Sequence, residues 1–375
     1  MTSRRATRTT ITTTATTVTG RPARGALSAA AACALVLAAS SCSLVGADDD
    51  TAAGGSGESD TVVLLTHNDF FLPDEVVAAF EEESGYALDI RPTDGVGNLV
   101  NLVAEQSGKP SGDVVFGVDN TFASRVLGAD ALTSYDGDLP AGVATYALPG
   151  DDDGDLVPVD NGNVCVNVDD VWFAKEDLDP PTTLDDLTDP AYEGLFVVPS
   201  AASSSPGLAF LLATIAEYGD QWPSYWADLL ANDTEIVAGW SEAYQSEFTQ
   251  GGGEGDKPIV VSYDSSPAFT VDGEGGTTTS ALLETCYQQV EYAAALDGAD
   301  NPEGAQALLD FMVGPDVQAA LPESMYVFPV AEGTELPSDW ATFAARPRES
   351  YEVDPAEIEA NREDWLIEWT DIISR

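Results

Sequence analysis

The chain has 375 residues, of which 44% are hydrophobic, and its 65 acidic against 14 basic residues give a formal net charge of −51. Such a charge repels nucleic acid and anionic lipid headgroups, so neither is expected as a partner. Acidic residues occur throughout the chain and lysine is scarce, so we interpret the charge as a solvated surface suited to a salty medium. Weak, salt-screened attraction of cationic solutes is the second interpretation. The length and the hydrophobic content suggest two domains.

The first 42 residues have the pattern of an export signal. Residues 1–41 contain five arginines and no acidic residue, and the run GALSAAAACALVLAA at 25–39 is apolar. This run is too short to span a bilayer. It ends in ASSC, which resembles the cleavage box of bacterial lipoproteins and makes Cys42 the lipidated first residue of the mature chain. That family usually has leucine where Ala39 stands, and ordinary cleavage without a lipid is the alternative.

Residues 43–60, SLVGADDDTAAGGSGESD, are rich in Gly, Ser, Ala and Asp. They have nothing with which to form a core and predict a flexible tether. Of the four cysteines, Cys33 lies in the signal, and Cys165 and Cys286 remain in a body expected to be exported and oxidising. Both lie in strand-like segments, so two states remain possible at this point: a disulfide between them, or two buried free thiols. Two cysteines and a single histidine make a poor zinc site.

From residue 61 the chain alternates strands and helices. The segments 61–67, 86–93 and 113–119 have the apolar patterns of strands. A helix is predicted from about Pro73 to Gly85, and another opens at 94–98. The order βαβαβ predicts an α/β fold with a mainly parallel sheet, in which ligand chemistry lies at the carboxyl ends of the strands.

The second half repeats this style. GLFVVPS at 194–200 predicts a strand, and SSSPG at 203–207 predicts the start of a helix, with serine as N-cap and proline in the first turn. PIVVSYDSSPAF at 258–269 repeats the pattern, with proline opening a further helix. Near the end three residues form an apolar stripe at helical spacing that we assign to the core rather than to a site: Trp365, Trp369 and Ile372.

Polar residues stand where the predicted strands end. In a doubly wound topology they would all point into one crevice between two lobes. They are His67-Asn68-Asp69, Asp94-Gly95, Asp119-Asn120, Asp160-Asn161, Ser203-Ser204-Ser205, Gly239-Trp240 and Ser262-Tyr263-Asp264-Ser265-Ser266. The crevice would contain acids, hydroxyl groups, helix N-termini and aromatic faces.

These residues do not form a catalytic group. The chain has one histidine, His67, no GxSxG motif and no lysine beside a serine in a recognisable motif, so nucleophilic hydrolysis lacks its partners. Asp94 and Asp119 could act as paired glycosidase carboxylates, but most acids here are surface charge. There is no Walker loop, and GVG at 95–97 is too weak for a dinucleotide site. We expect no enzyme and no cofactor.

A binding protein fits the same residues better. Faces of tryptophan and tyrosine hold a cationic ring by stacking and cation–π attraction, which contribute about 1–2 kcal/mol when desolvated. Carboxylates can neutralise the positive charge of the ring, and helix N-termini flanked by serine residues bind phosphate. The sequence therefore favours a ligand with a cationic ring and a phosphate arm.

Six stretches in order carry a family resemblance. They are LVPVDNGNVCVNVD, SSSPGLAFLL, GWSEAYQ, VSYDSSPAF, FMVGPDVQAALPESMYVFPV and REDWLIEWTDIISR. Together they resemble the thiamine-binding proteins of bacterial ABC importers, of the periplasmic-binding-protein type 2 family, which are related to iron and polyamine binders. The resemblance implies two α/β lobes with a two-strand hinge, the first over 61–163 and 290–375 and the second over 164–289.

The resemblance also implies thiamine or its phosphates at the lobe interface. The residues carried over by position are His67, Asp94, Gly95, Ser204, Ser205, Trp240, Tyr263, Phe269 and Tyr326. His67 and Phe269 stand where familiar members have tyrosine; Phe269 keeps the aromatic face, and His67 can still donate to a phosphate when protonated. Tyr326 aligns with a tryptophan, although a slip of one residue would substitute Phe328.

As partners, the resemblance implies an ABC permease, on which the closed form docks, and a separate ATPase. It implies a monomer at the extracytoplasmic face of the membrane, anchored there by the lipid on Cys42, or in the periplasm. It also places Cys165 and Cys286 on neighbouring hinge strands, which favours the disulfide. A ferric-ion or polyamine receptor is the alternative. Ferric receptors use adjacent tyrosines, whereas SYDSSPAF offers only Tyr263; acids and aromatic residues suit a polyamine.

Overall fold

The computed structural model describes residues 60–375. The predicted export signal, Cys42 and the predicted tether up to residue 59 lie outside the described residues. None of the helices in the described part combines the length and the apolar character that a membrane crossing requires.

The first half of the sheet is a parallel three-stranded unit. Strand β1 (Thr61–His67) pairs in parallel with both β2 (Ala87–Thr93) and β3 (Val114–Asp119). Helix α1 (Asp74–Ser84) and helix α2 (Val96–Glu105) make the connections. This arrangement confirms the predicted βαβαβ order. It brings the carboxyl ends of three strands to one edge of the sheet.

The second half repeats the design with different strands. Strand β6 (Phe196–Pro199) pairs in parallel with β7 (Glu235–Val237) and with β8 (Ile259–Tyr263). Between β6 and β7 lie α5 (Ser205–Tyr218) and α6 (Trp222–Ala231). The first of these helices begins at the serine-rich segment, as predicted.

The helix predicted after β8 is only a short turn. Residues Ser266–Phe269 form one 3₁₀ turn, and Ser265 precedes it without a side-chain cap hydrogen bond. Pro267, the second residue of the turn, satisfies the local rule for a helix start. The two serines are engaged elsewhere: the Ser265 hydroxyl donates to the Tyr326 carbonyl at 2.5 Å, and the Ser266 hydroxyl accepts from the Tyr263 backbone N–H at 3.2 Å.

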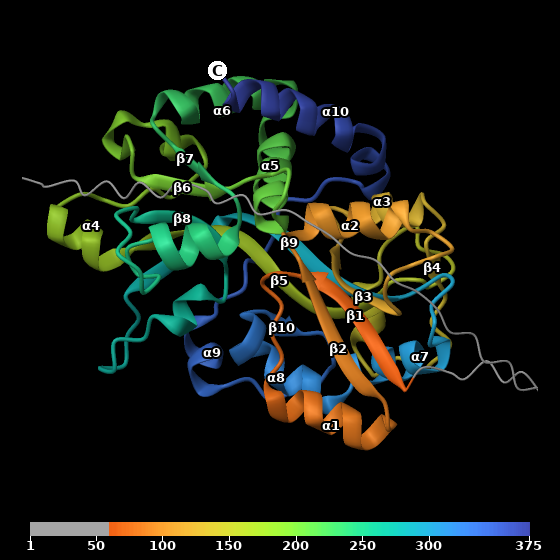
Figure 1. The fold of residues 1–375 in the computed structure, drawn as a ribbon. Helices are drawn as coiled ribbons and strands as arrows, with labels where there is room; N and C mark the ends of the chain where they lie inside the picture. The colour runs from red at the N-terminus through yellow and green to blue at the C-terminus, as the bar shows by residue number, and fades with distance from the viewer. Residues whose placement is uncertain (1–59) are drawn as a thin grey trace, which may run out of the picture. The chain divides into compact units, whose positions relative to one another are not determined.

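Two long antiparallel strands join the halves. Strand β5 (Val157–Asp169) and strand β9 (Thr279–Leu296) run side by side through the centre of the fold (Figure 1). The sheet order is β2-β1-β3-β9-β5-β8-β6-β7, and the pairs β3–β9 and β5–β8 are antiparallel. The strands at each end of the sheet are parallel, as predicted for the two lobes, and the two connecting strands between them are antiparallel. The predicted hinge boundaries, 163/164 and 289/290, fall inside these two strands.

The remaining elements cover the sheet and its edges. They are α3 (Ala123–Leu127), β4 (Leu132–Thr133), α4 (Asp170–Glu176), α7 (Pro302–Met312), α8 (Pro315–Met325), β10 (Phe328–Pro329), α9 (Ser338–Phe343) and α10 (Pro355–Ile373). Strand β4 pairs with β9, and β10 pairs with β5.

The C-terminal helix α10 packs against the second half. Its Trp369 meets Trp226 of α6 edge to face, with ring centroids 5.5 Å apart. Trp369 and Ile372 are buried, and Trp365 is partly buried against the same core. The stripe is therefore core, as predicted. The sequence grouped 290–375 with the first lobe, and α10 contacts both halves, because its Arg362 guanidinium also lies 5.2 Å from the centroid of the Phe122 ring beside α3.

A disulfide links Cys165 of β5 to Cys286 of β9. Both residues are buried, and Cys165 lies between the two pairs that flank a register shift of the β5–β9 ladder, Val164–Tyr287 and Val166–Leu282. The bond ties together the two strands that connect the halves.

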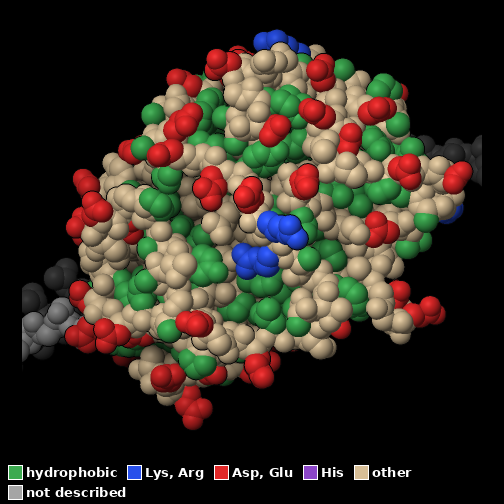
Figure 2. Space-filling model, turned by 180° about the vertical axis from the view of Figure 1, so that it is seen from behind, with side chains coloured by type: hydrophobic (Ala, Val, Ile, Leu, Met, Phe, Trp, Pro, Cys, Tyr) green, Lys and Arg blue, Asp and Glu red, His purple; other side chains and the backbone are tan. Residues whose placement is uncertain are grey.

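Acidic side chains are spread over the surface. On the face seen in Figure 2 they are scattered from edge to edge, and Lys and Arg side chains are few. Among the described residues, the ion pairs of Lys and Arg involve only a handful of acids, such as Asp89, Glu235 and Asp264. Most of the surface charge is therefore solvated.

Candidate functional site

The ends of the strands surround one cavity of about 900 Å³. Its lining comes from the segments that follow β1, β2, β7 and β8, from the start of α5 and from the end of α8. Eight of the nine predicted site residues line it: His67, Asp94, Gly95, Ser204, Ser205, Trp240, Tyr263 and Tyr326. The ninth, Phe269, does not.

Phe269 lies behind the cavity wall. Its ring packs on Tyr326, with centroids 4.2 Å apart, and edge-on against Trp340. Phe328, which a slipped alignment would have placed at the site, belongs to the same small apolar cluster. Tyr326 is thus the aromatic residue of this segment that lines the cavity, and Phe269 packs on its ring from behind.

Trp240 belongs to an aromatic wall of the cavity. Its ring stacks on Tyr244, with centroids 5.2 Å apart and planes 9° from parallel, and tilted contacts follow to Tyr326 at 5.6 Å and Tyr263 at 6.2 Å. The indole Nε1 donates to the Ser262 hydroxyl at 2.9 Å. The side chain is only 8% exposed, so packing and a hydrogen bond fix its orientation at the cavity edge.

Tyr326 is held in an unusual backbone conformation. It follows the last residue of α8 with φ at +63°, in the left-handed region. This conformation costs roughly 1–2 kcal/mol for a residue with a Cβ. Such local strain clusters at functional sites, and here it turns an aromatic ring toward the cavity.

Two helix N-termini open onto the cavity. Helix α5 starts after Ser204 and α2 starts after Gly95, and neither residue supplies a side-chain cap hydrogen bond. Free backbone N–H groups and the positive end of the helix dipole therefore face the same space. Gly95 has φ at +84°, and a Cβ there would lie 2.5 Å from the Ser203 carbonyl oxygen. Only glycine lets the two helix starts approach so closely.

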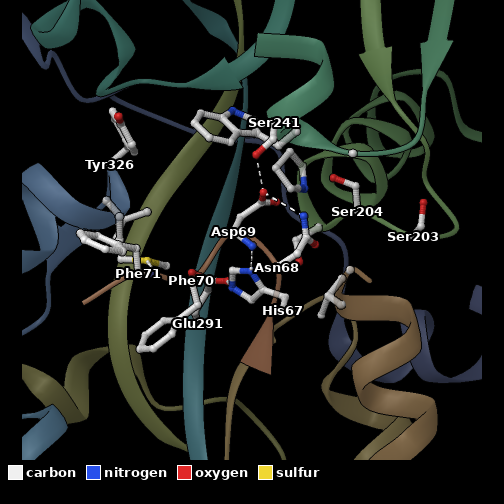
Figure 3. A pocket seen from close by; sticks show the side chains of 18 of the residues that line it. His67, Asn68, Asp69, Phe70, Phe71, Ser203, Ser204, Ser241, Glu291 and Tyr326 are labelled. Carbon is white, nitrogen blue, oxygen red and sulfur yellow. Dashed lines mark hydrogen bonds and ion pairs between the residues drawn. The ribbon is translucent and has the colours of Figure 1, made fainter. Parts of the chain in front are cut away.

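A hydrogen bond crosses the cavity. The Ser241 hydroxyl, after β7, donates to Asp69 Oδ1, after β1, and the Asn68 side-chain amide donates to the same oxygen at 3.1 Å (Figure 3). The Asp69 backbone N–H donates to His67 Nδ1 at 3.2 Å. The polar run after the first strand pointed to this place, but the predicted site included only His67 from it.

Three acidic residues lie in a row under the cavity. On β9, Glu291 is paired with Asp119 of β3 on one side and with Asp160 of β5 on the other. Directly paired residues of antiparallel strands point to the same face of the sheet. The three are 4%, 0% and 1% exposed respectively, and Glu291 lines the cavity. The sequence signal that could have revealed Glu291 is an acid inside the otherwise apolar strand VEYAAAL.

Burial sets the protonation of this row. Burial, with a smaller contribution from the charge of Glu291, raises the pKa of Asp119 to about 6, although hydrogen bonds from Ser205 and Thr121 lower it. Burial, and then the charge of Glu291, raise the pKa of Asp160 well above its ordinary value. Both oxygens of Asp160 are buried and have no hydrogen-bond partner that satisfies normal geometry. Asp119 and Asp160 therefore keep their protons to higher pH than exposed carboxylates do.

His67 is the basic neighbour of the row. Its Nε2 lies 3.3 Å from Glu291 Oε1. Burial lowers the pKa of His67, but the hydrogen bond and charge of Glu291, and then the charges of Asp69 and Asp119, outweigh it and leave the pKa raised. The imidazole fits against β3 because residue 117 is glycine: a Cβ there would lie 2.2 Å from His67 Cδ2.

Within residues 60–375, no group of three or more His, Cys, Asp or Glu side chains is arranged to hold a metal ion. The cavity instead combines an aromatic wall, two helix N-termini and buried acids. That set can hold an organic molecule with an aromatic cation at one end and an anion at the other.

Two parallel sheet units, two connecting strands and a polar cavity at the strand ends define the two-lobed class of periplasmic binding proteins. Residues 75–348 match the model of the bacterial extracellular solute-binding protein family. The chain belongs to this family.

Its relatives are similar over most of their length. A thiamine-binding periplasmic protein of Escherichia coli K12 is 32% identical over 305 residues, covering 80% of this chain and 88% of the relative. One from Brucella suis biovar 1 is 31% identical, covering 79% and 86%. A solved periplasmic thiamin binding protein has a TM-score of 0.74 at 28% identity, covering 86% of this chain and 98% of its own. Iron-bound HitA from Pseudomonas aeruginosa shares the fold, with a TM-score of 0.66 at 19% identity over 83% of this chain and 99% of its own.

Proposed function

We propose that this protein captures thiamine or a thiamine phosphate outside the cytoplasm and delivers it to an ABC permease. The observation that carries the proposal is the cavity in which an aromatic wall faces two helix N-termini. Thiamine combines a cationic aromatic ring with an alcohol or phosphate arm, so it uses both features. The names of the relatives and of the solved neighbour support the same ligand.

In this proposal the predicted residues have separate roles. Trp240, Tyr263 and Tyr326 contact the rings of the ligand. The starts of α5 and α2, with Ser204 and Ser205 on one and Gly95 on the other, receive the phosphate.

The other three predicted residues have supporting roles in ligand binding. Asp94 and His67 contact the ligand from the first half, and Phe269 acts indirectly by supporting Tyr326. Residues 61–163 and 290–375 form one lobe, and residues 164–289 form the other.

The protein catalyses nothing in this scheme. A separate ATPase supplies the energy, and the lobes close on the ligand before docking. We further propose that it acts as a monomer, held at the outer face of the membrane by a lipid on Cys42, or free in the periplasm. Incubation with thiamine phosphate should release no phosphate; turnover abolished by His67→Ala would instead make it an enzyme.

Calorimetry on the mature protein tests the ligand. Thiamine, thiamine phosphate, thiamine diphosphate, spermidine and ferric citrate are titrated in turn, and at least one thiamine form should bind at micromolar concentration or below. Micromolar binding of spermidine with no binding of any thiamine form would overturn the proposal. Mass spectrometry of the copurifying small molecule is an independent check.

A polyamine receptor is the second candidate. Four acidic residues line the cavity, Asp69, Asp94, Glu291 and Glu323, and such residues suit a chain of ammonium groups. A ferric receptor is less well supported, because the cavity presents isolated tyrosines, Tyr263 and Tyr326, rather than an adjacent pair.

A further inference from the structure

The acidic row under the cavity has little counter-charge. Within the described residues, no Lys or Arg makes an ion pair with Asp119, Asp160 or Glu291, and the single ion pair of the row is that of Glu291 with His67. Like charges that face each other across strands destabilise a sheet, and buried charges without partners cost several kcal/mol. The row therefore weakens the fold on its own.

Of the three acids, Glu291 is the one in contact with the cavity. It lines the cavity with His67 and Tyr263, whereas Asp119 and Asp160 lie beside it on the neighbouring strands. Within the row, Glu291 is therefore the acid that a positive group in the cavity meets first, in surroundings where water screens the attraction poorly.

We propose that Glu291 determines the specificity for positively charged ligands: its carboxylate is the counter-charge of the ligand cation, and the row behind it releases a proton to solvent when that cation binds. The inference rests on the proposed function, in which the cation is the thiazolium ring of thiamine. It assigns the role to a residue outside the set that the sequence indicated.

The direction of the proton transfer follows from the groups that face Glu291. These are His67 on β1, Asp119 on β3, Asp160 on β5 and Tyr263 on β8, and the charge of Asp69 acts on His67 in turn. A bound cation favours the ionised form of every acid and the neutral form of His67. Each effect releases protons, so affinity should rise with pH through the pKa of Asp119, about 6, and continue to rise through the raised pKa values of His67 and Asp160.

The test compares Glu291→Gln with Glu284→Gln. Glu284 lies on the same strand, is exposed and does not line the cavity. Calorimetry with thiamine, in buffers of different ionisation enthalpy at pH 6, should show proton release by the wild type. Glu291→Gln should weaken binding at least about tenfold, the loss of one partly desolvated charge pair, and reduce that release. Glu284→Gln should match the wild type.

A neutral probe separates charge recognition from damage to the cavity. The uncharged pyrimidine half of thiamine, 4-amino-5-hydroxymethyl-2-methylpyrimidine, should bind wild type and Glu291→Gln within about twofold of each other, because it offers no fixed charge. The thermal midpoint of Glu291→Gln should equal or exceed that of the wild type, because removal of one acid relieves repulsion.

A second variant covers the case in which Glu291→Gln does not fold. Asp160→Asn keeps the carboxylate at Glu291 and should retain thiamine affinity while releasing fewer protons. Equal thiamine binding by Glu291→Gln and wild type, or an equal loss for thiamine and the neutral probe, would overturn the inference alone. A wild type that binds no form of thiamine would overturn the proposed function and this inference with it.

Discussion

At the scale of single residues, two aromatic residues of the cavity wall are each held in place by a hydrogen bond with a nearby serine. Ser262 orients the Trp240 indole, and Ser265 holds the Tyr326 backbone in its left-handed conformation. The exposure of Trp240 to a cavity was inferable, because a tryptophan after a strand-ending glycine has no obvious packing role. The proposed role of Glu291 could not be inferred from the sequence, because it depends on strand register. The sequence alone does not show that Glu291 pairs with Asp119 and Asp160.

Trp240→Ala should weaken thiamine binding by about 1–2 kcal/mol, because the cation loses an aromatic face in a desolvated site. Titration calorimetry measures the change. Trp172→Ala is the control, since that tryptophan packs on Phe173 of α4 and does not line the cavity. Equal affinities for Trp240→Ala and the control, with both variants folded, would contradict the proposed role.

At the scale of elements, strands and helix starts agree with simple pattern rules. Strands β1, β3, β6 and β8 are short apolar runs, and α5 begins where serine and proline predict. Two features of the structure were not predicted from the sequence. Residues Glu242–Glu247 form a π-helical turn that carries Tyr244 under the Trp240 ring, and no local pattern distinguishes such a turn from an ordinary helix.

The second missed feature is the return of the chain after α9. The Tyr351 backbone N–H donates to the Cys286 carbonyl at 2.7 Å, and α10 then packs on the second half. The stripe of Trp369 and Ile372 predicted a buried face. Which partner it meets depends on where the chain crosses, and only the tertiary structure decides that.

Gly117 gives an element-scale prediction. It lies at a bulge of β3 with φ at +94°, and a Cβ would collide with the His67 ring. Gly117→Ala should lose roughly 1–2 kcal/mol of stability from the backbone and a further 1–3 kcal/mol from overpacking, and it should displace the imidazole.

The matched control for Gly117→Ala is Gly154→Ala. That glycine has φ at +71° but no heavy atom near its Cβ position, so only the backbone cost applies. Urea unfolding of both variants gives the two free energies. If the two losses are equal, the contact between Gly117 and His67 does not constrain the strand.

At the scale of the whole molecule, two features act on stability beyond the core. The Cys165–Cys286 bond closes a loop of 121 residues across the connecting strands. The uneven charge, 65 acidic against 14 basic residues, works against compactness through self-repulsion. Composition alone indicated the charge, whereas the disulfide needed the neighbouring positions of β5 and β9.

Removal of the disulfide should lower the unfolding free energy by about 3–5 kcal/mol, because a long loop in the unfolded chain is released. The comparison is between wild type and the double variant Cys165→Ser/Cys286→Ser in urea. Addition of a reductant should destabilise the wild type and leave the double variant unchanged. A double variant as stable as the wild type would argue against a stabilising cross-link.

Salt should stabilise the protein. At about 1 M salt the screening length falls to about 3 Å, so repulsion among the solvated acids weakens while the buried row is little affected. The thermal midpoint at constant pH should rise with sodium chloride. A midpoint that falls or stays level would mean that surface repulsion does not limit stability.

The Asp69–Ser241 hydrogen bond spans the cavity between the two halves. A solute that enters or leaves by that route must wait for this contact to break. The rate of solute exchange is then limited by a conformational change of the protein. The observed rate of capture in stopped-flow mixing would therefore reach a plateau at high solute concentration. Ser241→Ala would raise that plateau and shorten the lifetime of the complex with the bound molecule. The Ser241 hydroxyl group would then limit the rate at which the protein releases its solute.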